Sequence, residues 1–209
     1  MMFRLLSAMS ISEGFLLKSL LVGLVALPCY LVNPYVPVIV VLGLMMKAIL
    51  EAYFPTEGVY ANYRLYGSNF LGIVRQLDAF VFIVLNGLNF IGVVVLLVLN
   101  PAFSFGMVFP QTMFYNGSIL WVLIYTQSLA AYSFYSGRPE VLRSIWALLA
   151  GVIVMCLGCL FWLWVGFEQV GRCLILGLAL LSLWYFLPMQ LAARIKKSMV
   201  DDDIGEKTW

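Results

Sequence analysis

The sequence predicts an all-α integral membrane protein with six transmembrane helices, cytoplasmic N- and C-termini and a short amphipathic helix at the N-terminus. Its 209 residues are 64% hydrophobic and only 11% charged, whereas soluble domains are about 45–50% apolar and about 25% charged. The mean hydropathy is +1.01. The apolar runs are continuous and do not alternate with polar residues, which favours helices over the strands of a membrane barrel.

Six segments are long and apolar enough to cross a bilayer, which takes about 20 residues because the hydrocarbon core is about 30 Å thick. They are residues 15–32, 35–54, 77–99, 117–136, 142–166 and 170–189. Before them, residues 1–14 form a lead-in whose apolar side chains can share one helical face, so we expect this lead-in to lie along the membrane surface.

Three parts of the chain follow from these segments: the lead-in 1–14, a six-helix transmembrane domain 15–189 with a cytoplasmic loop at 55–77, and a polar cytoplasmic tail 190–209. Nearly all Lys and Arg residues fall on the side of the two termini, and only Arg172 falls on the opposite side. The positive-inside rule therefore places both termini in the cytoplasm of a multi-pass protein of the cell (inner or plasma) membrane.

The positions of the charged residues limit which energy source a transporter with this sequence could use. Asp78 is expected to open the third span on the cytoplasmic side, where a carboxylate favours a helix N-terminus. No carboxylate is then expected at mid-bilayer, which leaves little for a proton- or sodium-driven carrier. Lys47 and Glu51 lie one helical turn apart, and two interpretations stay open: a snorkelling pair at a helix end or a buried coupling pair.

The sequence lacks the common motifs of catalytic, metal-binding and nucleotide-binding sites. It has no histidine, no G-x-x-x-x-G-K-[ST] phosphate loop, no H-E-x-x-H and no G-x-S-x-G. We therefore expect no catalytic residues, no metal site and no enzyme activity in this chain. The formal net charge of +2 gives no basis for binding nucleic acid.

Polar residues inside the spans form two clusters, Asn86 with Asn89 in the third span and Thr126 with Gln127 in the fourth. Amide and small polar residues in lipid commonly mark helix–helix contacts. The other interpretation is a polar lining for a substrate path, and the sequence leaves both open.

Other short patterns are expected to be structural. Cys156 and Cys159 lie in mid-span, where burial disfavours a thiolate, so packing beside Gly158 is expected rather than redox chemistry. The glycosylation-like triplet 116–118 is expected to be a turn, and Trp162 and Trp164 are expected in an aromatic belt at the outer membrane face.

The cytoplasmic loop 55–77 ends in a short amphipathic stretch. Such a helix can dock into a groove of a soluble protein, or it can lie on the lipid headgroups.

Three segments carry a resemblance to a family: LYGSNFLGIVRQLDAF at 65–80, YSFYSGRPEVLRSIWALLAG at 132–151 and LLSLWYFLPMQLAARIKKSMVD at 180–201. In their order and character they resemble the small six-span permeases of the ABC-2 type, in the branch paired with ATPases for peptide and antibiotic export or immunity. The resemblance covers nearly the whole chain as a pattern of degenerate motifs.

The resemblance implies a permease subunit of an ABC exporter that moves an amphipathic or hydrophobic cargo, such as a peptide, lipid or drug-like molecule. ATP and Mg would be bound by a separate cytoplasmic ABC ATPase, and this chain would hold no cofactor. A second copy of the permease or a paralogous one, together with membrane lipid, would complete the assembly. The residues that match the family's ATPase-coupling segment are Leu65, Tyr66, Gly67, Ser68, Asn69, Phe70 and Arg75.

An alternative from a different class is a non-transporting structural or assembly subunit of a larger membrane complex. The packing-type polar clusters favour it, because interhelical hydrogen bonds are the commoner use of such residues.

Overall fold

A computed structural model of the chain describes residues 70–99, 105–138, 140–165 and 170–206. These residues form helices joined by short connections, without a strand: α5 (Phe70–Leu99), α6 (Phe105–Ser136), α7 (Glu140–Arg143), α8 (Ile145–Val165) and α9 (Val170–Glu206). The predicted lead-in, the first two spans with Lys47 and Glu51, and loop residues 55–69 lie outside the described residues.

Three helical segments of the described chain are long and apolar enough to cross a membrane: Phe70–Leu99, Ile145–Trp162 and Gly171–Ser198. They correspond to the predicted third, fifth and sixth spans, and they have the length and composition of membrane-protein helices. The predicted fourth span is also helical, as part of α6, but it carries more polar residues and is not among these three.

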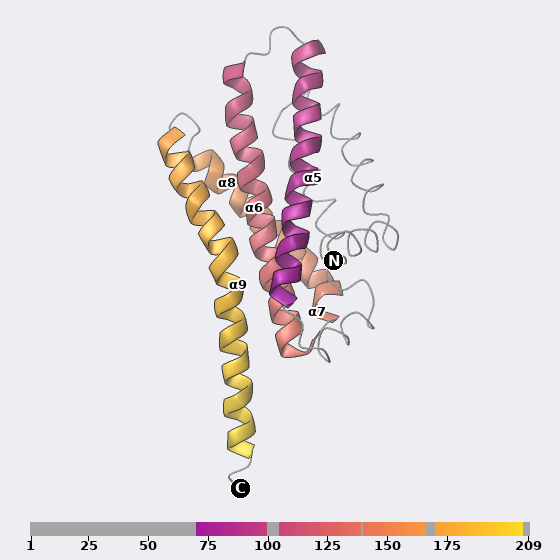
Figure 1. Cartoon of the computed structure of the whole chain (residues 1–209), viewed down its shortest axis with the longest axis vertical. Coiled ribbons are helices and arrows are strands. Elements are labelled where there is room, and N and C mark those ends of the chain that lie inside the picture. Colours follow the sequence, from indigo (N-terminus) through magenta and orange to yellow (C-terminus); the bar gives the residue numbers. More distant parts are fainter. Residues whose placement is uncertain (1–69, 100–104, 139, 166–169, 207–209) are drawn as a thin grey trace.

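The central element of the described bundle is α6 (Figure 1). It packs most extensively against α9, then against α8, and less against α5. Helix α9 runs alongside α6 and continues past the ends of the other helices toward the C-terminus (Figure 1). Helix α6 is therefore the element against which the other long described helices pack.

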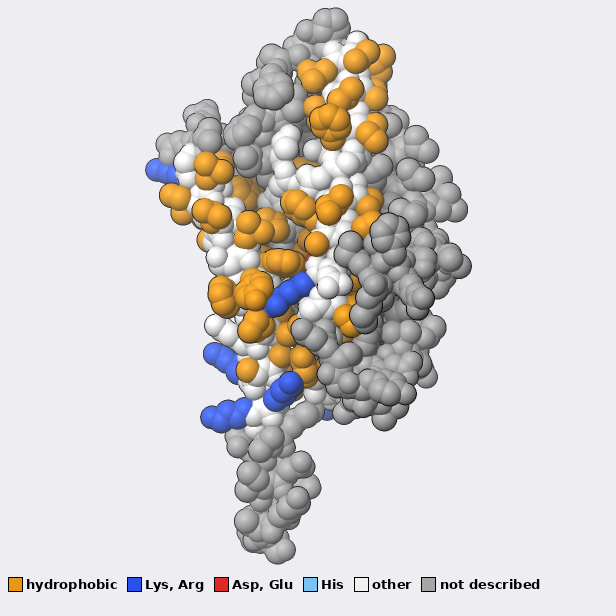
Figure 2. Space-filling model, in the orientation of Figure 1, with side chains coloured by type: hydrophobic (Ala, Val, Ile, Leu, Met, Phe, Trp, Pro, Cys, Tyr) orange, Lys and Arg blue, Asp and Glu red, His pale blue; other side chains and the backbone are white. Residues whose placement is uncertain are grey.

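Large apolar side chains cover the outside of the bundle. Phe90 on α5, Trp146 and Trp164 on α8, and Ile175 on α9 are all more than two-thirds exposed. Figure 2 shows hydrophobic side chains over the drawn faces of α5 and α9, with Lys and Arg gathered farther along α9. Exposed apolar surface on this scale is rare on soluble monomers, so hydrocarbon is its natural surrounding.

Two helices begin earlier than the sequence analysis expected. Helix α5 starts at Phe70 rather than at residue 77, so the end of the predicted amphipathic loop is continuous with the span. Helix α6 starts at Phe105, so the triplet 116–118 lies within a helix, and its prediction as a turn is wrong. Residues of moderate hydropathy next to an apolar run can extend a helix when neighbouring helices cover them.

The end of α6 is fixed by backbone geometry. Gly137 has a φ of 73°, the left-handed conformation that glycine adopts without a Cβ penalty. The amide of Arg138 donates to the Ser133 carbonyl at 3.0 Å, and the Ser133 hydroxyl donates to the Arg138 carbonyl at 2.8 Å. These bonds close the helix C-terminus and direct the chain into α7.

A glycine–tryptophan seam, formed by Gly117, Trp121, Gly158 and Trp162, joins α6 to α8. A Cβ at Gly158 would lie 2.7 Å from Trp121 Cγ, and a Cβ at Gly117 would overlap the Trp162 indole. Each glycine therefore leaves room for the tryptophan of the other helix. The prediction that Trp162 lies in an interfacial belt is wrong, since it is 2% exposed; Trp164 is 84% exposed.

Candidate functional site

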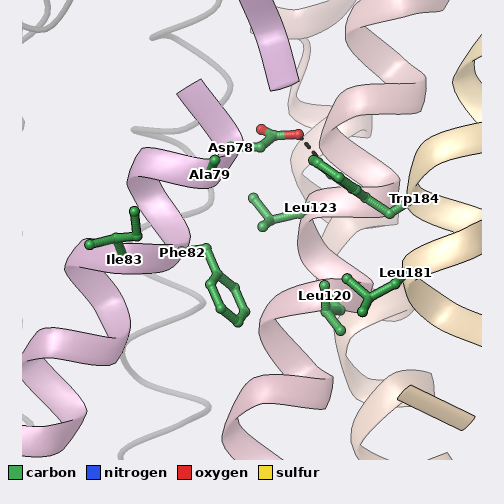
Figure 3. Close-up of a pocket in the computed structure, with 8 residues that line it drawn as sticks. All are labelled: Asp78, Ala79, Phe82, Ile83, Leu120, Leu123, Leu181 and Trp184. Carbon is green, nitrogen blue, oxygen red and sulfur yellow. Dashed lines mark hydrogen bonds between the residues drawn. The ribbon is translucent and has the colours of Figure 1, made fainter. Parts of the chain in front are cut away.

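A cavity of about 210 Å³ lies where α5, α6 and α9 face one another. Its walls expose only apolar surface, and Figure 3 shows the lining side chains arranged around it: Asp78, Ala79, Phe82, Ile83, Leu120, Leu123, Leu181 and Trp184. Clefts lined mainly by apolar side chains with a few polar groups are the usual form of small-molecule sites.

Asp78 and Trp184 close one end of this cavity. The indole Nε1 of Trp184 donates to Oδ2 of Asp78 across 3.1 Å, as the dashed line in Figure 3 marks. Asp78 is fully buried, and a buried carboxylate without such partners would cost several kcal/mol, which is why buried charges are hydrogen-bonded. The bond therefore links α5 to α9 across the cavity end.

One turn earlier on α5, Arg75 makes a second link. Its Nη2 donates to the Tyr185 carbonyl at 2.7 Å, and its guanidinium carbon lies 4.0 Å from the centroid of the Tyr185 ring. Pro188 follows within the same turn of α9; lacking an N–H, it leaves the Trp184 carbonyl without its usual intrahelical donor. We call Arg75, Asp78, Trp184 and Tyr185 the α5–α9 clasp.

On α9 the clasp lies within an apolar stretch bounded by charged residues. Trp184 is twelve residues from Arg172 and ten from Arg194, which is about 18 Å and about 15 Å along the helix. On α5, the helix starts at Phe70, eight residues before Asp78. The prediction that Asp78 opens a helix is therefore wrong, and the prediction that no carboxylate lies at mid-bilayer stays a prediction.

A signal for this position is present in the sequence. Phe70, Val74, Leu77, Val81 and Leu85 are buried at spacings of three and four residues, which is the core-facing stripe of a helix. Asp78 falls within that stripe. A helix that begins at residue 70 places the Asp78 carboxylate on the side that faces the bundle.

The predicted coupling residues are only partly described. Leu65, Tyr66, Gly67, Ser68 and Asn69 lie outside the described residues. Phe70 is 1% exposed and stacks on Phe134 of α6 with ring centroids 4.2 Å apart. Arg75 belongs to the clasp. The structure thus places these last two side chains against other parts of this chain.

The two predicted polar clusters both lie on helices that contact one another, α5 and α6. Asn86 donates from Nδ2 to the Phe82 carbonyl of its own helix at 2.9 Å, and Asn89 is buried. Thr126 donates to the Leu123 carbonyl at 3.3 Å.

Gln127 is fully buried, and neither its amide oxygen nor its amide nitrogen has a hydrogen-bond partner. It follows Leu120 and Leu123 at helical spacing, so it shares their side of α6.

The cysteines of α8 do not act as a pair. Cys156 is exposed on the outer face, whereas Cys159 is buried with its Sγ 3.7 Å from the Ser118 hydroxyl of α6. Within the described ranges no group of three or more His, Cys, Asp or Glu side chains could hold a metal ion.

Comparison of the chain with family models, with curated proteins and with solved structures finds no match. The candidate site consists of a buried carboxylate, an indole and a partly buried arginine beside an apolar cavity.

Proposed function

We propose that this chain is the six-span transmembrane permease subunit of an ABC exporter, with both termini in the cytoplasm and ATP hydrolysed by a separate subunit. The observation that carries the proposal is the segment 65–80, which resembles the ATPase-coupling segment of ABC-2 permeases. Apolar membrane-type helices and the absence of a nucleotide-binding motif from the sequence support it, since such a permease needs a partner to supply work.

Helix α5 offers a route from that segment to the cavity. Residues 70–99 form one continuous helix, so a force applied near its N-terminal end would move Arg75 and Asp78 together. These residues hold α9. In the proposed cycle, ATP-driven closure of the partner shifts α5, loosens the clasp and changes the width of the cavity for an amphipathic or hydrophobic cargo.

The test is co-purification of the full chain from its own membranes in mild detergent. We expect a stoichiometric soluble ATPase with the wild type. Tyr66→Ala should lower its recovery by about tenfold, because an aromatic contact residue at an interface commonly contributes more than 1 kcal/mol. Tyr132→Ala is the matched control, since Tyr132 is exposed on α6 and lies outside the proposed contact.

Two results would contradict the proposal: a wild-type preparation that contains no ATPase, or equal recovery of the ATPase with both variants. Phe70 is unsuitable for this test because it is buried, so its replacement would disturb the fold and the contact together.

A second candidate is a structural subunit that transports nothing. The burial of Phe70 against Phe134 favours it, because an apolar residue of the proposed contact segment is used inside the chain. Such a subunit would co-purify with membrane partners and would be indifferent to Tyr66→Ala.

A further inference from the structure

We propose that α9 binds an anionic phospholipid, with the lipid phosphate on Arg194, Lys196 and Lys197 and the acyl chains on the apolar surface that precedes them. We call these three side chains the basic band. All three are exposed, and Figure 2 shows Lys and Arg gathered on this part of α9. The inference goes beyond the proposed function, because it depends on the membrane-type helices and not on an ATPase.

The first argument is the position of the basic band along the helix. The apolar segment Gly171–Ser198 contains 28 residues, which is about 42 Å of helix, whereas the hydrocarbon core of a bilayer is about 30 Å thick. The last residues of the segment can therefore reach the phosphate layer. Long basic side chains near the end of a spanning helix extend toward that layer, where they attract anionic lipids.

The second argument is the arrangement of the three cations. Arg194 and Lys197 are three residues apart, so they are neighbours on one face of α9. Lys196 lies toward α6, with its Nζ 4.7 Å from the centroid of the Tyr135 ring. Among the described side chains, none of the three cations forms an ion pair with a carboxylate. Like charges on one helix face repel, and a phosphate beside them would remove this repulsion and accept their hydrogen bonds.

The third argument is the charge at the two ends of the segment. The end near α8 carries one cation, Arg172. At the other end, Arg138 and Glu140 are both exposed after the end of α6, and their charges offset each other. The basic band therefore supplies the excess positive charge, and an anionic headgroup is attracted mainly to that end.

The acidic residues that follow the basic band fix the direction of α9. Helix α9 continues to Glu206, past the ends of the other helices (Figure 1). The run Asp201–Asp203 starts four residues after Lys197, which is about 6 Å farther along the helix. Because an anionic surface repels these carboxylates, α9 points away from the bilayer here and the basic band remains its contact with the phosphates.

The fourth argument is the apolar surface that precedes the basic band. Phe186, Leu187 and Met189 are between 41% and 54% exposed, and they lie five to eight residues before Arg194, about 8–12 Å along the helix. Acyl chains that hang from a phosphate on the basic band would cover these side chains. A soluble anion would use the charges alone, so the surface as a whole fits a phospholipid.

The test uses the purified full chain in detergent and measures bound lipid by native mass spectrometry. The probes are phosphatidylglycerol, which is anionic, and phosphatidylcholine with the same acyl chains, which has no net charge. We expect the wild type to bind phosphatidylglycerol at least about tenfold more tightly, because three cations contribute. The triple variant Arg194→Gln, Lys196→Gln, Lys197→Gln should remove this preference.

Two matched variants should retain the preference for phosphatidylglycerol. Lys196→Arg combined with Lys197→Arg keeps the charges and changes the side chains. Arg172→Gln removes a cation from the opposite end of the segment. Glycerol phosphate, which carries the phosphate without acyl chains, should not displace the lipid at equal concentration.

Four results would overturn the inference. They are equal binding of both lipids by the wild type, a retained preference in the triple variant, a loss of preference in either matched variant, and displacement of the lipid by glycerol phosphate. The last result would identify a site for a soluble phosphate. The wild type, the matched variants and glycerol phosphate still decide the matter if the triple variant does not fold. All of these measurements are independent of ATPase recovery, so the exporter proposal is tested separately.

Discussion

On its α8 side, α6 is held by two glycines that each accept a tryptophan, Gly117 with Trp162 and Gly158 with Trp121. Where α5 and α9 face each other beside α6, the described links between them are side-chain hydrogen bonds around a cavity. Close backbone approach leaves little freedom to move. Side-chain bonds across a cavity can break and re-form while each helix stays intact. We therefore expect the contact between α6 and α8 to stay fixed, and the contact between α5 and α9 to be able to open.

The largest expected effect on stability comes from disrupting the glycine–tryptophan seam between α6 and α8. Gly158→Leu forces a side chain into the Trp121 indole, whose Cγ would lie 2.7 Å from the new Cβ. Overpacking of this kind costs about 3 kcal/mol or more where backbones must separate. We expect a large fall in unfolding temperature, measured by thermal denaturation in detergent.

Gly87→Leu is the matched control, because nothing lies within 4 Å of a Cβ at Gly87. It should leave the unfolding temperature unchanged or raise it slightly, since leucine has the higher helix propensity. Equal destabilisation by both variants would mean that the seam is not a tight contact.

A second prediction concerns the bond between Asp78 and Trp184. In a double-mutant cycle of Asp78→Leu and Trp184→Phe, we expect a coupling free energy of about 1 kcal/mol, within the range of interhelical hydrogen bonds in membrane proteins. The cycle is measured by unfolding in mixed detergent. Additive effects would show that the two side chains do not hold the helices together.

A third prediction tests whether Arg75 stabilises the link between α5 and α9. Arg75→Gln removes the bond to the Tyr185 carbonyl and the contact with its ring, and should lower the free energy of unfolding by about 0.5–1 kcal/mol. Arg194→Gln, which removes an exposed charge farther along α9, should have no measurable effect. The same denaturation assay compares the two, and a larger loss for Arg194→Gln would contradict the clasp.

The smallest effect is expected at Asn86. Its amide bonds within its own helix to the Phe82 carbonyl, so Asn86→Ala should change the free energy of unfolding by less than about 0.5 kcal/mol. Chemical denaturation measures this difference. A loss of more than about 1.5 kcal/mol would mean that Asn86 bonds between helices instead.

The sequence predicted the helical class, the membrane character and the approximate places of α5, α6, α8 and α9. It did so because spanning segments differ from loops in composition, which can be read locally. The sequence did not show which face of each helix packs against other helices and which face is exposed. Trp162 and Trp164 differ by two residues, yet one is buried and the other exposed, and in an apolar helix no polar stripe distinguishes them.

The candidate site was missed for a related reason. Asp78 was assigned to a helix end because the apolar run starts at residue 77, whereas the helix starts at Phe70. Its partner Trp184 lies 106 residues away. A single sequence contains no signal for a contact over that separation, and only the packing of α5 beside α6 and α9 brings the two together.

The contrast between the two sides is tested most directly by distances between spin labels in a cysteine-free background, in nanodiscs. One pair joins Ile83 on α5 to Leu181 on α9, and the other joins Tyr132 on α6 to Ile153 on α8, all four exposed. We predict a broad or two-peaked distribution for the first pair and a single narrow one for the second. Two equally narrow distributions would contradict the account.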